Sequence, residues 1–431
     1  MGRKKVYDSI HRFIHVDELE TKVIESLPFQ RLNYVHQLGM AFLVYPGGTH
    51  KRFEHSLGVM EVATKIYDQV TILDPKREDQ LVLDKVPKVG TKEHIYWRSV
   101  VRMAAICHDM GHLPLSHSAE SKILGEGGHE SWTRRIILSD MLKPFWDELN
   151  ELMPEQNTAI DIAKAAIGPN KMPSIDTSLC DYSPWEKIVS EIITGDFFGA
   201  DRIDYLLRDA QYTGLSYGMF DYHQLLETLR IVPSAQVAGE LEIGVEENGI
   251  EACEALLLSR YFLHKRLSQY PAVKSYTFHL ARFMEVYFKE KLQTDSVEDY
   301  ISMNDSMVLA KLHEVIKDPD APGYYDACVL LKQARRYKAI PLKKGIDLTE
   351  MMALQSKHQI PDGQIDWEQG GEHGTQLSLD FPVRLRSGDI VSGELLSDIT
   401  IPRHGYSWIF LSYDHLDTFL PEAMDSMPGD A

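Results

Sequence analysis

The chain has 431 residues, 44% of them hydrophobic and 25% charged, a composition typical of a soluble globular protein large enough for two or three domains. Its formal net charge of −19 opposes a polyanion at long range, so nucleic acid is not expected as the main ligand. No long apolar run and no apolar segment behind the basic start MGRKK are present, so we expect no membrane span, no secretory signal and a cytosolic location.

The order of sequence patterns predicts a mainly α fold with a smaller C-terminal α+β domain. Residues 1–20 mix β-branched, aromatic and charged side chains, which indicates an extended or hairpin-like arm. Apolar residues recur every three or four positions between 21 and 290, which predicts a helical domain, with short helices and loops on its rim at 140–187. Residues 291–431 begin in a helical pattern, but FPVRLRSGDIVSGELL and YSWIFLSYD are typical of strands.

The stretch AAICHDMGHLPLSH places a histidine and an aspartate at the end of an apolar helix. His108 and Asp109 are about 100° apart around a helix, so both reach one ion only where the helix ends. Gly111 and Pro114 supply that end. The four cysteines form no CxxC pair, so a metal here would be bound by imidazole and carboxylate groups.

Two further segments carry groups of the same kind. THKRFEHSLGVM contains two histidines, and GDFFGADRIDYLLRDAQYTG contains four aspartates, each in a helical pattern. One histidine from the first and one aspartate from the second would complete a His/His/Asp/Asp set, which suits a divalent metal with open positions for water and substrate. Taken alone, a histidine such as His55 on a helical face is more often a packed core residue than a metal ligand, and an aspartate such as Asp201 is usually a solvated helix charge.

In this order, the blocks RFEHSLGV, CHDMGHLPLSH and ADRIDYLLRD resemble the HD superfamily of metal-dependent phosphohydrolases. More narrowly, they resemble the deoxynucleoside triphosphate triphosphohydrolases, both the bacterial dGTPase-like enzymes and the catalytic core of the SAM-and-HD-domain enzyme. The similarity extends through FQRLNYVHQLGMAFLVYPGGTHKRFEH and SRYFLHKRLSQY. It implies an HD-domain helical core and a divalent metal, with Mn, Mg, Fe, Zn and Ni all open. The implied ligands are His55, His108, Asp109 and Asp201.

The same resemblance implies roles for other side chains. His112, His117 and His129 are expected around the α-phosphate, with His117 giving a proton to the leaving 5′-oxygen. Arginines are expected on the phosphates, and Gln37 and Asp209 on the sugar. The full set of implied substrate contacts is Gln37, Leu38, Arg52, Arg202, Tyr205, Asp209, Arg260, Gln269 and Tyr270. A nucleoside triphosphate substrate, a nucleotide activator and a homodimer or homotetramer are implied as well.

The chain departs from this family at several positions. Ser268 stands where deoxy-selective members place a tyrosine against C2′ of the sugar, which leaves room for a 2′-hydroxyl. In the expected activator site, Glu25 and Asn33 replace an aspartate and an arginine, and Asp8 stands where an asparagine is common. Two other functions stay open: another HD phosphohydrolase, such as a nucleotidase or phosphodiesterase, and a nucleotide sensor without turnover.

Overall fold

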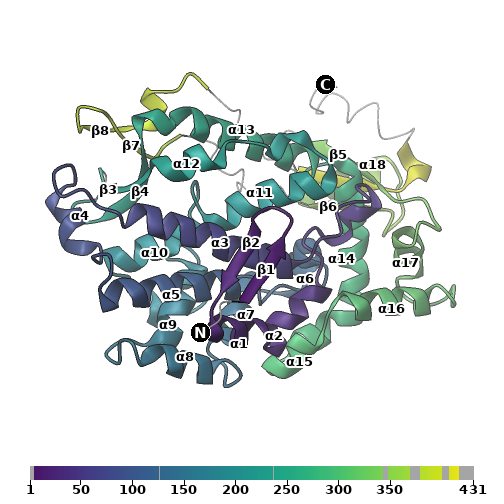
Figure 1. Ribbon diagram of the computed structural model, residues 1–431. Coiled ribbons are helices and arrows are strands. Elements are labelled where there is room, and N and C mark those ends of the chain that lie inside the picture. The colour runs from purple at the N-terminus through teal and green to yellow at the C-terminus, as the bar shows by residue number, and fades with distance from the viewer. Residues whose placement is uncertain are drawn as a thin grey trace.

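The computed structural model describes residues 4–125, 127–235, 237–342, 348–368, 379–399 and 407–416. Helices dominate this part of the chain, and the strands form small sheets, as Figure 1 shows. The predicted fold class, mainly α with a smaller α+β region, is confirmed. Within the described residues, no helix has both the length and the apolarity needed to cross a membrane.

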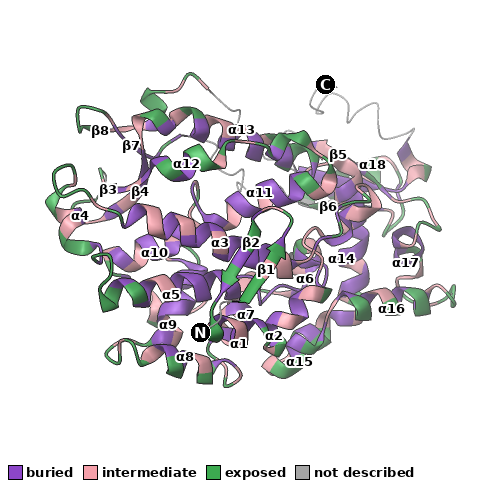
Figure 2. Ribbon diagram, viewed as in Figure 1, coloured by how far each residue is buried: buried purple, intermediate pink, exposed green. Residues whose placement is uncertain are grey.

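The core is built around two long helices that pack on each other, α3 (Arg52–Val70) and α5 (Lys92–Cys107). Against them lie α9 (Thr158–Ile167), α10 (Pro184–Thr194) and α11 (Ala200–Thr213). Their apolar residues recur at helical spacing, so each helix buries one face. Figure 2 shows buried residues meeting in the middle of the molecule, whereas α8 (Lys143–Asn150) and α15 (Val297–Ser302) carry exposed faces.

The prediction of a rim segment at 140–187 is wrong for its central part. Helix α9 is buried, with Ile162 and Ala163 fully inaccessible, and it packs between α5 and α10. Asp161, also buried, accepts a hydrogen bond from Tyr96 of α5 at 2.5 Å. The sequence around α9 is rich in proline and glycine, which mark its ends and say little about the depth of the helix between them.

In the part of the chain that the structure describes, the strands form three sheets. A hairpin joins β1 (Lys4–Asp8) to β2 (Arg12–Val16). The second sheet has the order β3-β4-β7-β8, in which β7 pairs in parallel with β4. The third has the order β5-β9-β6. The strands of these two sheets are β3 (Leu229–Pro233), β4 (Leu241–Glu246), β5 (Lys338–Leu342), β6 (Ile365–Glu368), β7 (Pro382–Arg384), β8 (Ile390–Ser392) and β9 (Ser407–Leu411).

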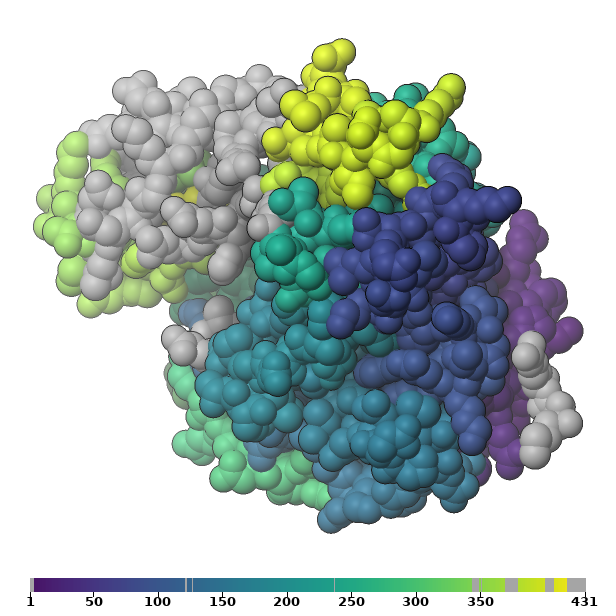
Figure 3. Space-filling view, turned by 90° about the vertical axis from the view of Figure 1, so that its left-hand side faces the viewer, coloured from purple at the N-terminus to yellow at the C-terminus, as the bar shows by residue number. Residues whose placement is uncertain are grey.

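The second sheet crosses the boundary predicted near residue 290, because two of its strands come from each side. Arg384 of β7 forms ion pairs with Glu78 and Glu246, both at 2.6 Å. Figure 3 shows this C-terminal segment, in yellow, lying on blue residues from the first quarter of the chain. The remaining helices are α1 (Glu18–Ile24), α2 (Leu27–Gln30), α4 (Gln80–Lys85), α6 (Glu120–Ile123), α7 (Gly128–Ile137), α12 (Tyr222–Thr228), α13 (Ile250–Arg266), α14 (Pro271–Leu292), α16 (Asp305–Val315), α17 (Tyr324–Leu330) and α18 (Leu348–Lys357).

Glu191 on α10 is half-buried against β4, and this burial predicts how the stability of the protein depends on pH. Its carboxylate accepts the backbone N–H of Ile243 at 3.3 Å, and burial beside Glu242 and Asp196 raises the pKa of Glu191 to about 8. A carboxyl with a raised folded-state pKa favours folding at low pH and loses that contribution as pH rises toward 8. Glu191→Gln should therefore increase the unfolding temperature relative to the wild type at pH 8.5 and change it little at pH 4.5. The exposed Glu251→Gln variant is the control, and its unfolding temperature should follow that of the wild type at every pH. The same parallel behaviour in Glu191→Gln would contradict the prediction.

Candidate active site

Three helices bring the predicted metal ligands together. His55 lies in the first turn and a half of α3, His108 and Asp109 follow the end of α5, and Asp201 lies in the first turn of α11. His55 Nε2 is 3.0 Å from Asp201 Oδ1 and 3.5 Å from Asp109 Oδ2. His108 Nε2 is 3.4 Å from Asp109 Oδ1 and 3.6 Å from Asp201 Oδ1. Two ring nitrogens and two carboxylates thus face one small volume.

The contacts of the two rings fit a cation in that volume. His108 Nδ1 donates to the carbonyl of Ala105 at 2.8 Å, which turns Nε2 toward the site, and this buried atom has no hydrogen-bond partner among the described residues. His55 Nδ1 is 2.7 Å from Asp204. Burial opposes a charge on His55, but Asp201 and Asp204 outweigh it and raise its pKa to about 10. A site that attracts a proton so strongly also suits a divalent metal bound by imidazole and carboxylate.

A second cluster joins His112, His117 and His129 to a residue that sequence reasoning missed, Glu120. The Glu120 carboxylate is 2.7 Å from His117 Nδ1 and 2.6 Å from His129 Nδ1. Burial opposes its ionisation, but hydrogen bonds from the two histidines hold its pKa well below the usual range. The rings of His112 and His129 stack at 3.6 Å between centroids, and His112 Nε2 lies 3.1 Å from Asp109. Glu120 therefore orients two histidines beside the first cluster, which consists of the four predicted metal ligands His55, His108, Asp109 and Asp201.

A strained loop presents His117 to the site. Leu115 and Ser116 have φ angles of 59° and 60°, a left-handed conformation that is costly for residues other than glycine. The contacts that hold it are specific: Asp305 accepts the N–H of Leu115 at 2.7 Å, and Ser116 accepts from Arg52 Nε at 2.8 Å. Arg52 also forms an ion pair with Asp109. The same arginine thus supports both the loop and the first cluster.

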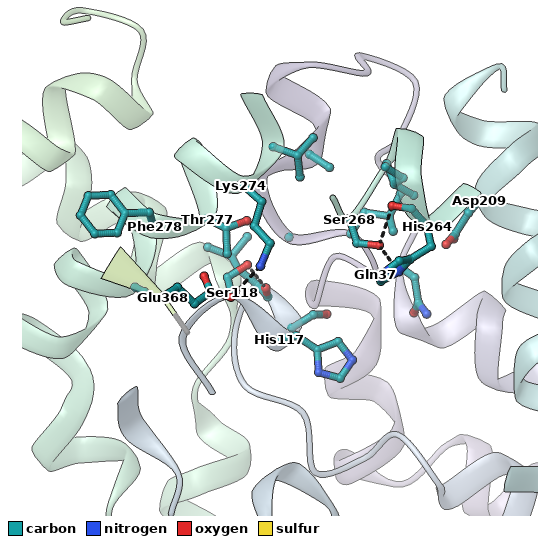
Figure 4. Close-up of a pocket in the computed structure, with 18 of the residues that line it drawn as sticks. Gln37, His117, Ser118, Asp209, His264, Ser268, Lys274, Thr277, Phe278 and Glu368 are labelled. Atoms are coloured by element: carbon teal, nitrogen blue, oxygen red, sulfur yellow. Dashed lines mark hydrogen bonds and ion pairs between the residues drawn. The ribbon is translucent and has the colours of Figure 1, made fainter. Parts of the chain in front are cut away.

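A cavity of about 600 Å³ opens beside these clusters (Figure 4). Its wall includes seven of the residues predicted to contact the substrate or to act on it, namely Gln37, Leu38, Arg52, His117, Tyr205, Asp209 and Arg260, together with Ser268. The Gln37 amide oxygen is buried without a hydrogen-bond partner in the described chain, and it is available to a ligand. Figure 4 shows Gln37, Asp209, His264 and Ser268 on one side of His117, and Lys274, Thr277 and Glu368 on the other.

Three predicted substrate contacts do not line this cavity. Arg202 donates to the carbonyl of Gly195 at 3.0 Å, and its buried Nε has no partner in the described part of the chain. Gln269 accepts a hydrogen bond from Trp408 of β9 at 3.1 Å, and Tyr270 lies beside Tyr45, with ring centroids 6.2 Å apart. The family pattern placed Gln269 and Tyr270 on the substrate, whereas here they contact neighbouring parts of the protein.

Among the described residues, Arg260 of the cavity wall has no carboxylate within ion-pair distance. Its Nη1 donates only to a backbone carbonyl, that of Asp196, at 3.0 Å. Burial and the nearby Arg202 lower the pKa of Arg260 to about 10. A bound anion would relieve this destabilisation, so the pair of arginines suits a phosphate group.

The residues expected in an activator site have other partners. Asp8 is buried and forms an ion pair with Arg208 at 2.8 Å, so it points into the helical core. Glu25 pairs with Lys4 at 2.7 Å on the surface, and Asn33 donates to Gln30 at 3.2 Å. The carboxylate of Asp8 is therefore bound within the interior of this chain, and an activator site stays a prediction.

Comparisons with known proteins agree with the site geometry. Residues 52–182 match the family model described as HD domain, a range that includes His55, His108 and Asp109. An uncharacterized protein of Methanocaldococcus jannaschii is 30% identical over 309 residues, covering 72% of this chain and 55% of that protein. The uncharacterized protein YwfO of Bacillus subtilis is 30% identical over 333 residues, covering 72% and 66%. Human deoxynucleoside triphosphate triphosphohydrolase SAMHD1 is 30% identical over 284 residues, covering 62% and 42%.

Solved structures extend the likeness along the whole chain. A hypothetical protein from Aquifex aeolicus has a TM-score of 0.71 at 25% identity, covering 99% of this chain and 100% of that one. A phosphohydrolase from Bacteroides thetaiotaomicron has a TM-score of 0.71 at 18% identity, covering 95% and 100%, and shows the shared fold. The chain belongs to the HD-domain family. It spans 42% to 66% of the length of the three curated relatives named above.

Proposed function

We propose that the protein hydrolyses nucleoside triphosphates at the α-phosphorus and releases a nucleoside and inorganic triphosphate. One observation carries the proposal: a single cavity wall combines Arg52 and Arg260, which would bind phosphate, Gln37 and Asp209, which would bind a sugar hydroxyl, and His117, which would donate a proton. The name of the human relative, a deoxynucleoside triphosphate triphosphohydrolase, supports the same reaction. A divalent metal held by His55, His108, Asp109 and Asp201 would supply an activated water and charge neutralisation.

The side chains of the cavity then have separate tasks. Arg52 and Arg260 bind the negatively charged oxygens, and Gln37 and Asp209 hold the sugar hydroxyl, which fixes the 5′-oxygen relative to His117. As the bond between the α-phosphorus and O5′ breaks, His117 donates a proton to O5′. Glu120 accepts the hydrogen bond from His117 Nδ1, which orients the ring for that transfer. The oxygen of water becomes part of the triphosphate.

The products separate this proposal from its alternatives. The purified protein is incubated with Mn²⁺ or Mg²⁺ and a panel of dNTPs and NTPs, singly and mixed, and the products are resolved by anion exchange. Nucleoside together with intact triphosphate is the expected result. Orthophosphate or pyrophosphate would indicate a different HD phosphohydrolase, and nucleotide binding without any product would indicate a sensor. The mixed samples test for a nucleotide activator, and gel filtration of the same samples tests for the predicted homodimer or homotetramer.

Ser268 provides a prediction on sugar selectivity. Its hydroxyl lies 3.0 Å from His264 Nδ1, and both residues line the cavity. A small side chain here leaves space for a 2′-hydroxyl, so the wild type should turn over ribonucleotides and deoxynucleotides with kcat/KM values within about tenfold of each other. Ser268→Tyr should fill that space and lower kcat/KM for NTPs about 10- to 100-fold more than for dNTPs. Equal effects on both sugars would contradict the assignment, and Ser268→Ala is the control for loss of the hydroxyl alone.

A further inference from the structure

The N-terminal hairpin turns a histidine toward the core. Strand pairing ends at Asp8 and Arg12, and Asp8 Oδ1 accepts the backbone N–H groups of Ile10 at 2.9 Å and His11 at 2.8 Å. Arg12 closes the turn with a φ of 65°. An aspartate that binds the amides ahead of it defines the course of a short turn. The His11 side chain is fully buried as a result, although it lies at the tip of a surface hairpin.

From this tip, a chain of buried charged groups leads to the metal-ligand candidate His55. The Asp8 Oδ2 atom pairs with Arg208 at 2.8 Å, and Arg208 binds Asp204 through two contacts of 2.9 and 3.0 Å. His11 Nε2 lies 2.7 Å from Asp204 Oδ1, and His55 Nδ1 lies 2.7 Å from Asp204 Oδ2. Figure 1 shows the purple hairpin crossing in front of the junction of α3 and α11.

The interior of α3 is shaped to accept this network. Gly58 lies one turn beyond His55, in the middle of the helix, where glycine costs roughly 1 kcal/mol relative to alanine. A Cβ at this position would lie 2.0 Å from Asp204 Oδ1 and 2.4 Å from Arg208 Nη2. The helix thus leaves free the space that the carboxylate and the guanidinium occupy.

We propose that Asp8 and His11 are positioning residues of the metal centre: His11 holds Asp204 directly and Asp8 holds it through Arg208, and Asp204 fixes the ring of His55 with its Nε2 toward the cation site. The inference rests on the metal site of the proposed function. Asp204 receives hydrogen bonds on both oxygens, so it cannot rotate without breaking an ion pair. Partners that orient a metal-bound histidine in this way typically change metal affinity or activity 10- to 100-fold when they are lost.

Metal affinity, measured without nucleotide, tests the proposal directly. His11→Gln and Asp8→Asn are compared with the wild type in a Mn²⁺ titration against a chelating competitor, with circular dichroism as a check on folding. We expect Mn²⁺ affinity to fall about 10- to 100-fold in both variants. His15→Gln makes the same chemical change on the exposed side of the same hairpin and should bind Mn²⁺ as the wild type does. Folded variants with unchanged affinity would overturn the proposal.

A second measurement uses the wild type alone, so it holds even if a variant fails to fold. Coupling between two sites is reciprocal, so a metal that depends on the hairpin must also stabilise the hairpin. Addition of Mn²⁺ should slow amide hydrogen exchange in residues 4–16 at least about threefold, with no change in α8 as the control. No change in the hairpin, or no Mn²⁺ binding by the wild type, would overturn the proposal. If only the nucleotide assay failed, the coupling between Mn²⁺ and the hairpin would still hold, and only the proposed substrate would be contradicted.

Discussion

Replacing Asp109 with alanine is expected to abolish metal binding and to lower nucleotide hydrolysis about a thousandfold or more. Asp109 lies within 3.5 Å of His55, His108 and His112 and pairs with Arg52, so it contacts four charged or ligand side chains of the site at once. Loss of a ligand removes a charge stabilisation of several kcal/mol from the transition state, and each 1.36 kcal/mol is a factor of about ten in rate.

Initial rates and bound metal, measured on the same preparations, check the Asp109 prediction. Asp147→Ala removes an exposed aspartate on α8 and should leave both quantities unchanged. The unfolding temperature of the Asp109 variant distinguishes loss of the site from loss of the fold. A folded Asp109→Ala protein that keeps metal and more than about a tenth of its activity would show that the reaction does not use this cluster.

Replacing His117 with alanine should reduce the rate about 10²- to 10⁴-fold while metal binding is kept. His117 lines the cavity, is held by Glu120 at 2.7 Å, and is not within the cluster of His55, His108 and Asp109. A general acid matters most for a leaving group that needs a proton. The nucleoside 5′-oxygen is such a group, and 4-nitrophenolate is not.

The leaving-group comparison tests this role of His117. Hydrolysis of 4-nitrophenyl triphosphate should fall by less than about tenfold in His117→Ala, whereas hydrolysis of a nucleoside triphosphate falls by the full amount. Glu120→Gln keeps the histidine and removes its ionised partner, so it should give an intermediate loss on the nucleotide. Equal losses on both substrates would contradict proton donation by His117 and would assign it to phosphate binding.

Local sequence carries enough information to predict the first cluster. His108 and Asp109 interrupt an apolar helix, and the blocks around His55 and Asp201 keep a recognisable order, so the structure brings together groups that the sequence had already marked. The helical periodicity also predicts α3, α5, α11 and α13. In each case the signal is contained within one helix and its end, where spacing alone decides which residues share a face.

What the sequence could not predict depends on contacts between distant segments. The position of Glu120, three residues after His117, indicates that the two side chains could meet on one helical face. Its contact with His129 could not be predicted, because it depends on how the chain folds back. Asp204 and Arg208 look like solvated charges of an amphipathic helix, and their burial follows from the hairpin and from Gly58. Gln269 follows the family pattern in sequence, yet it bonds to Trp408 instead. Periodicity cannot reveal these pairings because no single element contains both partners.

Hydrolysis in water enriched in oxygen-18 tests the central claim most directly. Products from one turnover of a nucleoside triphosphate are examined by phosphorus NMR and mass spectrometry. Attack at the α-phosphorus puts the label into a terminal phosphate of intact triphosphate and leaves the nucleoside 5′-hydroxyl unlabelled, which is the result we predict. Label in the nucleoside, or in orthophosphate or pyrophosphate, would show that a different bond is cleaved and would contradict the assignment of this cavity to triphosphate release.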